Sequence, residues 1–232
     1  MDKILAGQTG MTRKEAHKAI ASGIVTVDGA VVKKSDLKFD PDAAVITLEG
    51  CAIGYKKNRY FLLNKPKGIL TASTDKRRVT VIDLFKGEPH YERLFAVGRL
   101  DKDTTGLLLI TDDGDYAHRV ISPKSRVEKE YIAKVDAPIP ESAAEAFRQG
   151  IILADGTKCL PAEIKVGESD RTVAHITVFE GKYHQIKRML GTLELGVEEL
   201  HRSRIASLTL PDNLKPGEYT ELSREEAYAV LE

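Results

Sequence analysis

The stretch that most constrains the fold is an apolar run with acidic residues at both ends, VGRLDKDTTGLLLITDDGD at residues 97–115. Its centre, Leu107–Ile110, is continuous hydrocarbon, which is typical of a buried β-strand. Two aspartates precede the run and three follow it: Asp101, Asp103, Asp112, Asp113 and Asp115. A strand of about ten residues at ~3.3 Å per residue separates the two groups by roughly 30 Å. The five carboxylates therefore cannot form a single site.

Most of these aspartates have a structural explanation. Asp112-Asp113-Gly114 reads as a turn into a helix over 114–121, where Asp113 or Asp115 favours the helix N-terminus. The Asp103–Gly106 segment can close its own backbone hydrogen bonds, which is a role in shaping the loop. Asp101 is left without a structural task and is the candidate for chemistry.

Two other chemistries fit the acidic residues less well. Asp101, Asp103, Thr105, Gly106 and Asp112 fall at the ligand and glycine positions of an EF-hand calcium loop. The twelfth position lacks the bidentate glutamate, and the apolar run has strand character, so a calcium-binding module is a remote alternative. A glycosidase-type carboxylate pair needs two acids facing one substrate, which the strand between Asp101 and Asp112 prevents.

Composition limits the class of protein. Of 232 residues, 30% are charged and 42% hydrophobic, which indicates a folded soluble protein. No apolar run approaches the roughly 18–20 residues of a membrane helix, and the start, MDKILAGQTG, has no signal-peptide pattern. Cys51 and Cys159 are far apart, which favours a reducing compartment over a zinc or disulfide site. We expect a cytoplasmic protein with no membrane partner and no bound metal.

Charge is unevenly distributed although its net value is zero. Residues 56–78 contain eight basic residues against one acid, Asp75, and include Lys65 and Lys67. Such a segment is suited to binding polyphosphate. We therefore expect Lys65 and Lys67 to contact nucleic-acid phosphates.

Residues 1–48 predict a small unit of two helices and a few strands. Thr12 and Glu15 form a capping-box pattern, and the helix that follows stops at Ser22-Gly23. Asp28-Gly29 predicts a hairpin, and residues 39–50 add a turn and a strand. The helix exposes three basic residues that can hold RNA phosphates: Arg13, Lys14 and Lys18.

Residues 49–58 read as a linker, and residues 59–232 as a larger domain. Strands are predicted over 59–65, 94–100, 106–111, 129–136, 161–166, 172–181 and 200–210. Helices are predicted over 80–85, 114–121, 140–149, 182–193 and 223–231, the last with a capping box from Ser223 to Glu226. Hairpins outnumber helical crossovers, so the predicted fold is α+β, with a mixed, mostly antiparallel sheet flanked by helices.

Two resemblances cover nearly the whole chain. MTRKEAHKAIASGIVTVDGAVV resembles the αL RNA-binding module of ribosomal proteins and RNA-modifying enzymes. GRLDKDTTGLLLITDDG resembles the signature of the RNA pseudouridine synthases, in the branch that modifies ribosomal RNA. Two later stretches agree in the same order, EKEYIAKV and EGKYHQIKRML.

The second resemblance implies an isomerase that needs no cofactor and acts on a flipped-out uridine of RNA. Asp101 would be the nucleophile or base, with Lys187 as the cation that keeps it ionised. Tyr131 would stack on the base, and Arg99 would fill the vacated space or hold phosphates. His184 would contact phosphate or backbone, and Arg188 lies on the basic helix that binds RNA.

The sequence also favours one RNA. Tyr183-His184 resembles the small-subunit branch, which predicts 16S ribosomal RNA, free or in an assembling subunit, as substrate for a monomeric enzyme. A 23S ribosomal RNA synthase with the same chemistry is the alternative. A catalytically idle RNA-binding or assembly factor is disfavoured, because Asp101, Tyr131 and Lys187 are all present.

Overall fold

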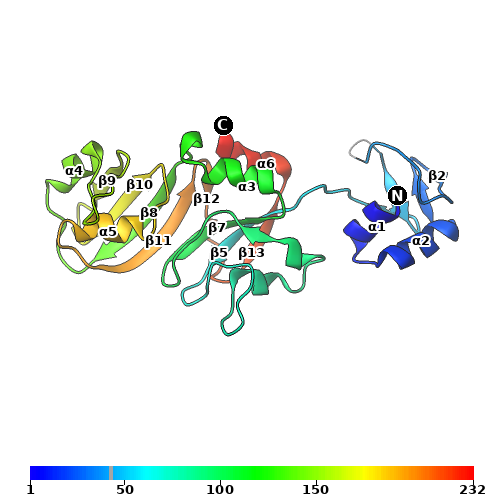
Figure 1. Ribbon diagram of the computed structural model, residues 1–232, viewed down its shortest axis with the longest axis horizontal. Helices are drawn as coiled ribbons and strands as arrows, with labels where there is room; N and C mark the ends of the chain where they lie inside the picture. Colours follow the sequence, from blue (N-terminus) through cyan, green and yellow to red (C-terminus); the bar gives the residue numbers. More distant parts are fainter. Residues whose placement is uncertain (42–43) are drawn as a thin grey trace. The chain divides into compact units, whose positions relative to one another are not determined.

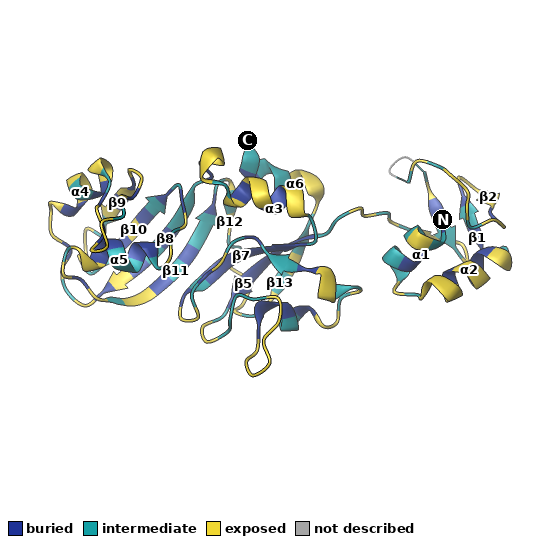
Figure 2. Ribbon diagram, in the orientation of Figure 1, coloured by how far each residue is buried: buried dark blue, intermediate teal, exposed yellow. Residues whose placement is uncertain are grey.

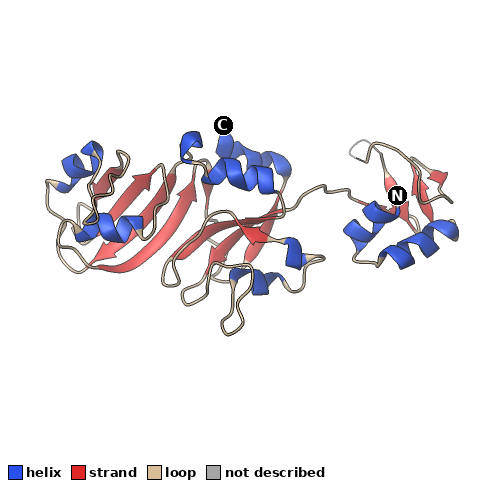
Figure 3. Cartoon of the chain, viewed as in Figure 1, coloured by secondary structure: helices blue, strands red, loops and turns tan. Residues whose placement is uncertain are grey.

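The computed structural model describes residues 1–41 and 44–232, which divide into two compact units. Met1–Asn58 and Phe85–Arg93 make up the first unit; Arg59–Leu84 and Leu94–Glu232 make up the second. Figure 1 labels their elements, and Figure 3 shows that each unit combines helices with a sheet of its own. No helix in the described ranges has the length and apolar character needed to cross a membrane.

The first unit packs two helices against a four-stranded antiparallel sheet of order β2-β1-β3-β4. The helices are α1 (Asp2–Thr9) and α2 (Arg13–Ala21), and the strands are β1 (Val25–Val27), β2 (Ala30–Val31), β3 (Ile46–Leu48) and β4 (Cys51–Ile53). Leu5, Ala16, Ile20, Val25 and Ile46 lie in its core. The basic residues Arg13, Lys14 and Lys18 of α2 are exposed. Figure 2 shows exposed residues along this helix in yellow.

Local sequence signals account for this unit. Thr12 and Glu15 form the expected capping box, and Asp28 and Gly29 both take positive φ angles, 51° and 79°, in the β1–β2 hairpin. The turn expected after residue 39 includes residues 42–43, which lie outside the described residues. Residues 51–53, expected in a linker, instead form β4, because Cys51–Ile53 pairs with Ile46–Leu48 across a two-residue turn.

The second unit is built on a nine-stranded sheet in which all pairings are antiparallel except that of β7 with β11. Seven strands follow the order β13-β5-β7-β11-β8-β10-β9; β6 pairs with β7, and β12 with β11. The strands are β5 (Tyr60–Lys65), β6 (Phe95–Ala96), β7 (Thr105–Thr111), β8 (Lys129–Val135), β9 (Glu163–Val166), β10 (Val173–Val178), β11 (Val197–Ile205), β12 (Leu208–Thr209) and β13 (Tyr219–Leu222). The predicted fold class is confirmed.

Helices cover this sheet where the sequence predicts them, with changes at their ends. They are α3 (Gly114–Ile121), α4 (Ala143–Gln149), α5 (Gln185–Gly191) and α6 (Arg224–Tyr228). Short 3₁₀ helices span Pro123–Ser125 and Ala229–Leu231, and another spans Val81–Phe85, where the sequence predicts a helix over 80–85. A further 3₁₀ helix, Tyr91–Arg93, belongs to the first unit. Ser223 and Glu226 form the predicted capping box. The strand predicted over 94–100 is reduced to Phe95–Ala96, and β13 was not predicted.

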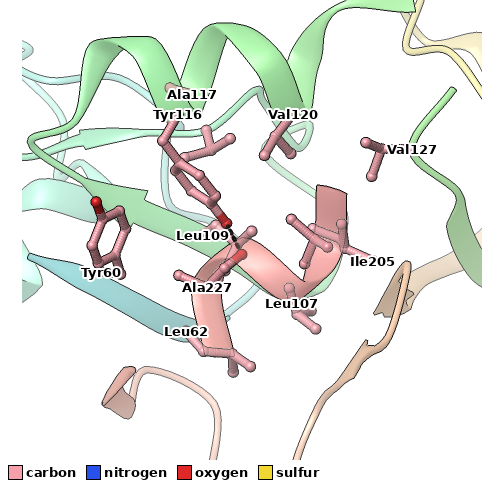
Figure 4. Close-up of a cluster of buried hydrophobic side chains, with 12 residues drawn as sticks. Tyr60, Leu62, Leu107, Leu109, Tyr116, Ala117, Val120, Val127, Ile205 and Ala227 are labelled. Carbon is pink, nitrogen blue, oxygen red and sulfur yellow. Dashed lines mark hydrogen bonds between the residues drawn. The ribbon is translucent and has the colours of Figure 1, made fainter. Parts of the chain in front are cut away.

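The core beside β5 and β7 lies under α3 and α6 (Figure 4). Leu107 and Leu109 contribute side chains from β7, and Tyr116 and Val120 contribute them from α3. The Tyr116 hydroxyl donates a 2.9 Å hydrogen bond to the Ala227 carbonyl, drawn as a dashed line in Figure 4. The apolar run of β7 therefore contributes two of its four residues, Leu107 and Leu109, to this core.

Asp113 joins β5, α3 and α6 through one carboxylate. It is the N-cap of α3 and accepts the Tyr116 amide at 3.0 Å. It also accepts the hydroxyls of Tyr60 at 2.6 Å and Tyr228 at 3.2 Å. Burial raises the pKa of Asp113, but these hydrogen bonds lower it by more than burial raises it. The pKa of Asp113 therefore lies below its ordinary value. The structural role predicted for this acidic turn is thus assigned to Asp113.

Replacing Asp113 with alanine should lower the free energy of unfolding by about 2–4 kcal/mol, because a helix cap and the acceptor for two tyrosine hydroxyls are lost. Urea unfolding measures the change, and hydrogen exchange of the α3 amides assigns it to this unit. The exposed Asp115 is the matched control, and its alanine variant should change stability by less than about 1 kcal/mol.

The effect should depend on pH with a defined sign. A carboxyl whose pKa is depressed in the folded state stabilises the protein above its unfolded pKa of ~3.9 and loses this contribution as pH falls through the folded value. The difference between wild type and Asp113→Ala should therefore shrink from pH 7 towards pH 3. Equal losses for Asp113→Ala and Asp115→Ala would contradict the cap assignment.

Candidate active site

Asp101 lies in a loop between β6 and β7, and the backbone on each side of it is fixed. The Asp101 carbonyl accepts the Thr104 amide at 3.1 Å. On its other side, the Thr71 hydroxyl donates to the Leu100 carbonyl at 2.7 Å. The Asp101 side chain is 28% exposed, so its carboxylate can reach a ligand. The loop thus presents one partly open carboxylate on a rigid support.

Lys65 is the main support of this loop. Its side chain lies at the end of β5 and is fully buried, and its Nζ donates to the carbonyls of Thr104 at 2.9 Å, Pro66 at 3.1 Å and Lys102 at 3.4 Å. Burial lowers the pKa of Lys65 to about 8, although the charges of Asp103 and Asp101 raise it in part. The prediction that Lys65 contacts RNA phosphates is wrong, because the ammonium group has no access to a ligand.

Two cationic or titratable groups face Asp101 from the α5 region. His184 Nε2 lies 3.4 Å from Asp101 Oδ1, and Lys187 Nζ lies 3.8 Å from Asp101 Oδ2. Lys187 makes its hydrogen bonds to Asp103 instead, at 2.6 and 2.7 Å. Its hydrogen bond is the main cause that lowers the pKa of Asp103. The sequence predicts that Lys187 pairs with Asp101. In the structure Lys187 lies near both carboxylates, but it is hydrogen-bonded to Asp103 and only within ion-pair distance of Asp101.

A pocket opens beside Asp101. It is lined by Arg99, Asp101, Thr104, Tyr131, Glu180, His184, Ile186 and Leu200, among others. The structure thus brings Arg99, Asp101, Tyr131 and His184 around one cavity, although they come from distant parts of the sequence. Lys187 contacts this group through Asp101 without lining the pocket.

Tyr131 is held in the pocket wall by Arg202, a residue that the sequence analysis missed. The two face each other in the β8–β11 ladder, and Arg202 Nη1 lies 3.3 Å from the Tyr131 hydroxyl. Arg202 Nε donates to the Leu107 carbonyl at 2.7 Å, and its side chain is only 3% exposed. Among the described residues its Nη2 has no hydrogen-bond partner. β11 contains a second arginine, Arg204, so the sequence carries no signal that singles out Arg202.

Gly106 allows β11 to approach β7 closely enough to place Arg202. Its φ angle is +101°, and an added Cβ would lie 2.3 Å from the Arg202 carbonyl oxygen. A side chain at this position would therefore both strain the backbone and push the strands apart. The glycine of the TTGLLL segment is a packing requirement of the site.

Glu180 fixes the turn that carries His184. It is 6% exposed and accepts the Leu160 amide at 2.9 Å and Gln185 Nε2 at 3.1 Å, and it also pairs with Lys182. Gln185 in turn accepts the Lys182 amide at 2.8 Å. This network precedes α5 and sets the position from which His184 reaches Asp101.

The remaining predicted RNA contacts differ in accessibility. Arg13, Lys14, Lys18, Lys67 and Arg99 are exposed, and Arg13 is paired with Asp2 at 2.9 Å. Arg188 is half-buried and pairs with Asp155 at 2.5 Å. Hydrogen bonds from Thr157, and then from Arg188, lower the pKa of Asp155 to about 2.

The alternative acid-based sites do not form. Asp101 and Asp112 lie at opposite ends of the seven-residue β7, a span of about 23 Å at ~3.3 Å per residue. Asp112 accepts the Arg59 amide at 2.8 Å. Within residues 1–41 and 44–232, no group of three or more histidine, cysteine, aspartate or glutamate side chains could hold a metal ion. The calcium interpretation is wrong, because a strand occupies the middle of the supposed loop.

Comparison with known proteins places this site in a family. The sequence model described as RNA pseudouridylate synthase matches residues 59–192. Ribosomal small subunit pseudouridine synthase A of Salmonella typhimurium is 41% identical and that of Escherichia coli 40%, each alignment covering at least 99% of both chains. An uncharacterized RNA pseudouridine synthase of Bacillus subtilis is 38% identical over 100% of this chain and 98% of its own. A crystal structure of a pseudouridylate synthase aligns with a TM-score of 0.70 at 35% identity, covering 99% of this chain and 98% of the other.

The structural role of Lys65 is open to a direct test. Lys65→Met removes the ammonium donor from the Pro66, Lys102 and Thr104 carbonyls, so we expect the free energy of unfolding to fall by about 1–3 kcal/mol. The Lys102 carbonyl keeps its 2.7 Å hydrogen bond from the Gly68 amide. Hydrogen exchange of the Thr104 amide and of the β5 amides locates the loss. Lys67→Met, two residues away and exposed, should stay within about 0.5 kcal/mol of wild type. Unchanged exchange at Thr104 in Lys65→Met would show that the ammonium does not hold the loop.

Proposed function

This chain belongs to the RNA pseudouridylate synthase family, and we propose that it converts one uridine of 16S ribosomal RNA to pseudouridine, with Asp101 as the catalytic carboxylate. The observation that carries the proposal is the pocket in which Asp101, Tyr131 and His184 meet. The choice of 16S RNA is supported by relatives that are named small-subunit synthases and match over the full length of the chain.

The reaction is an isomerisation whose atoms balance without a second substrate. The bond between N1 of uracil and C1′ of ribose breaks, the base turns, and C5 bonds to C1′ while the C5 proton leaves to a base and N1 gains a proton. Asp101 can add to the uracil ring, attack C1′ or remove a sugar proton. Each of these routes requires an ionised carboxylate beside the nucleoside.

The surroundings of Asp101 suit that requirement. A base stacked over the carboxylate excludes water, and desolvation alone favours the protonated form. His184 at 3.4 Å and Lys187 at 3.8 Å supply nearby groups that can stabilise the negative charge. Because Lys187 is also bonded to Asp103, it is held in place before RNA arrives. The exposed Asp103 carboxylate would thus act as an anchor for Lys187.

Tyr131 and Arg99 support the handling of the base. The Tyr131 ring is 9% exposed and forms part of the pocket wall, where it can stack on uracil. Arg202 fixes that ring through the hydroxyl. The target uridine has to leave its stack to reach the pocket, and the exposed Arg99 at the pocket edge can fill the vacated space or hold the neighbouring phosphates.

The first unit would supply much of the affinity for RNA. Residues 1–48 carry the proposed αL-type module, in which Lys14 and Lys18 of α2 are exposed. Lys67 of the second unit is also exposed and would add a phosphate contact. Phosphate contacts of this kind raise affinity without regard to sequence and weaken as salt rises. Specificity for one uridine would then come from the pocket and from the shape of the RNA.

The role of Asp101 predicts a loss of turnover. Asp101→Asn should lower kcat by at least about 10³-fold, since the amide cannot act as nucleophile or base. Tritium release from RNA labelled at C5 of uridine measures the reaction, with 16S and 23S transcripts assayed side by side. Asp103→Asn is the matched control and should lose less than about tenfold, because it only loosens Lys187. Full activity of Asp101→Asn would refute the assignment, and reaction with 23S RNA alone would refute the choice of substrate.

Neutralising α2 tests the proposed RNA-binding face. The double variant Lys14→Gln and Lys18→Gln should raise the KM for RNA, with kcat within about twofold of wild type. The slope of log Kd against log salt should fall by about 1–2, in proportion to the phosphate contacts removed. An unchanged salt slope would remove this helix from the RNA-binding surface.

A further inference from the structure

Tyr183 is an aromatic side chain left open to solvent beside the pocket. It lies in the turn before α5, next to His184, and is 67% exposed. Among the large hydrophobic side chains of residues 1–41 and 44–232 that are exposed to solvent, Tyr183 is the most exposed and the only aromatic one. Neither the core nor the chemistry at Asp101 accounts for a ring in this position.

The Tyr183 ring packs against the ring of the next residue. It stacks on the His184 ring, with centroids 3.8 Å apart and planes inclined by 18°. His184 lines the pocket, and its Nε2 lies 3.4 Å from Asp101. The two rings therefore form a continuous aromatic surface, the Tyr183–His184 pair, which leads from solvent to the candidate nucleophile.

The backbone beneath the pair is held in an uncommon conformation. His184 has φ 49° and ψ 34°, the left-handed region that a non-glycine residue adopts at a conformational cost. The Arg188 amide donates to the His184 carbonyl at 2.9 Å, and Arg188 Nη1 contacts the Tyr183 carbonyl at 3.4 Å. The Glu180 and Gln185 network fixes the start of the same turn. The fold thus maintains the strained residue that directs both rings.

We infer that the Tyr183–His184 pair is a stacking platform for an unpaired RNA base adjacent to the target uridine. This inference rests on the proposed function, since flipping one nucleotide leaves a neighbouring base with one face unstacked. An exposed tyrosine ring can cover that face whatever the base, because every base has a π-face. The exposed Arg99 lines the pocket, where it can contact phosphates of the same strand.

An RNA base fits this position better than an apolar partner. The turn is flanked by charged side chains, Lys182 paired with Glu180 and Lys187 paired with Asp103, so its surroundings are polar. A base can stack on the flat ring while its phosphate contacts the exposed Arg99 at the pocket edge. The pair would thereby link occupation of the neighbouring base position to the orientation of His184 beside Asp101.

The chain offers a clean spectroscopic probe of this platform, because it contains no tryptophan. In Tyr183→Trp the indole is the only one in the protein, and stacking on a base should quench its emission. We expect quenching when the full-length variant is saturated with the shortest 16S fragment that wild type modifies. Removing, in turn, each base beside the target uridine should abolish quenching at one position only. Ile152→Trp, at a residue 63% exposed outside the pocket lining, is the control and should not be quenched.

Kinetics provide the second readout. Tyr183→Phe keeps the ring and should remain within about twofold of wild type, whereas Tyr183→Ser should raise KM by roughly 10- to 100-fold. Because the side chain is exposed, neither change should alter the melting temperature. Unquenched emission at RNA saturation, shown by filter binding, together with an unchanged KM in Tyr183→Ser, would overturn the inference and assign the ring to another partner.

The two proposals fail differently. If wild type forms no pseudouridine in any ribosomal RNA while Tyr183→Trp is still quenched by unpaired RNA, the proposed reaction is wrong and the platform remains. If wild type is an active synthase and every Tyr183 variant behaves like it, the platform is wrong and the reaction remains.

Discussion

The candidate active site depends on one buried ammonium group. Lys65 leaves the end of β5 and donates to carbonyls of Pro66, Lys102 and Thr104. Pro66 directly follows β5, whereas Lys102 and Thr104 lie where the chain turns from the Asp101 loop into β7. The Gly68 amide also donates to the Lys102 carbonyl, at 2.7 Å. A cation that binds several carbonyls at once can hold such a loop where a single backbone hydrogen bond cannot. The position of Asp101 relative to α5 follows from this support.

Around that support, the site is assembled from strands and turns far apart in sequence. Gly106 lets β11 approach β7, and this approach places Arg202 behind Tyr131. Glu180 fixes the turn that carries His184 towards Asp101. Asp101, Tyr131 and His184 are thus each backed by a buried polar residue with its own hydrogen bonds. Such backing keeps catalytic groups in position before the substrate binds, which is how a rigid site lowers a reaction barrier.

Sequence patterns correctly predicted the elements that depend on residues close together in the sequence. The Thr12–Glu15 and Ser223–Glu226 capping boxes, the Asp28-Gly29 hairpin and the helix over 114–121 all follow from residues within a few positions of each other. The mostly antiparallel sheet followed from alternation and turn spacing. The short edge strand β13 was missed, because Tyr219–Leu222 is brief, with only two apolar positions, and gains its strand partner from β5.

What the sequence could not supply were contacts made across the fold. Lys65 is one of eight basic residues in 56–78, and only the end of β5 reveals that it points inwards. Lys187 Nζ lies 2.6 Å from Asp103 and 3.8 Å from Asp101, and this difference depends on where α5 places the lysine. Motif resemblance grouped Asp101, Tyr131 and Lys187. It could not show that Arg202 supports Tyr131, or that Glu180 fixes the turn that carries His184.

We propose that the Asp101 pocket modifies one uridine of 16S ribosomal RNA. The most direct test is to map pseudouridines in all ribosomal RNA from a strain that lacks this gene and carries either the wild-type or the Asp101→Asn gene on a plasmid. We expect one pseudouridine to disappear from 16S RNA in the deletion strain, to return with wild type and to stay absent with Asp101→Asn. An unchanged 16S map in the deletion strain, or a site restored by Asp101→Asn, would contradict this proposal.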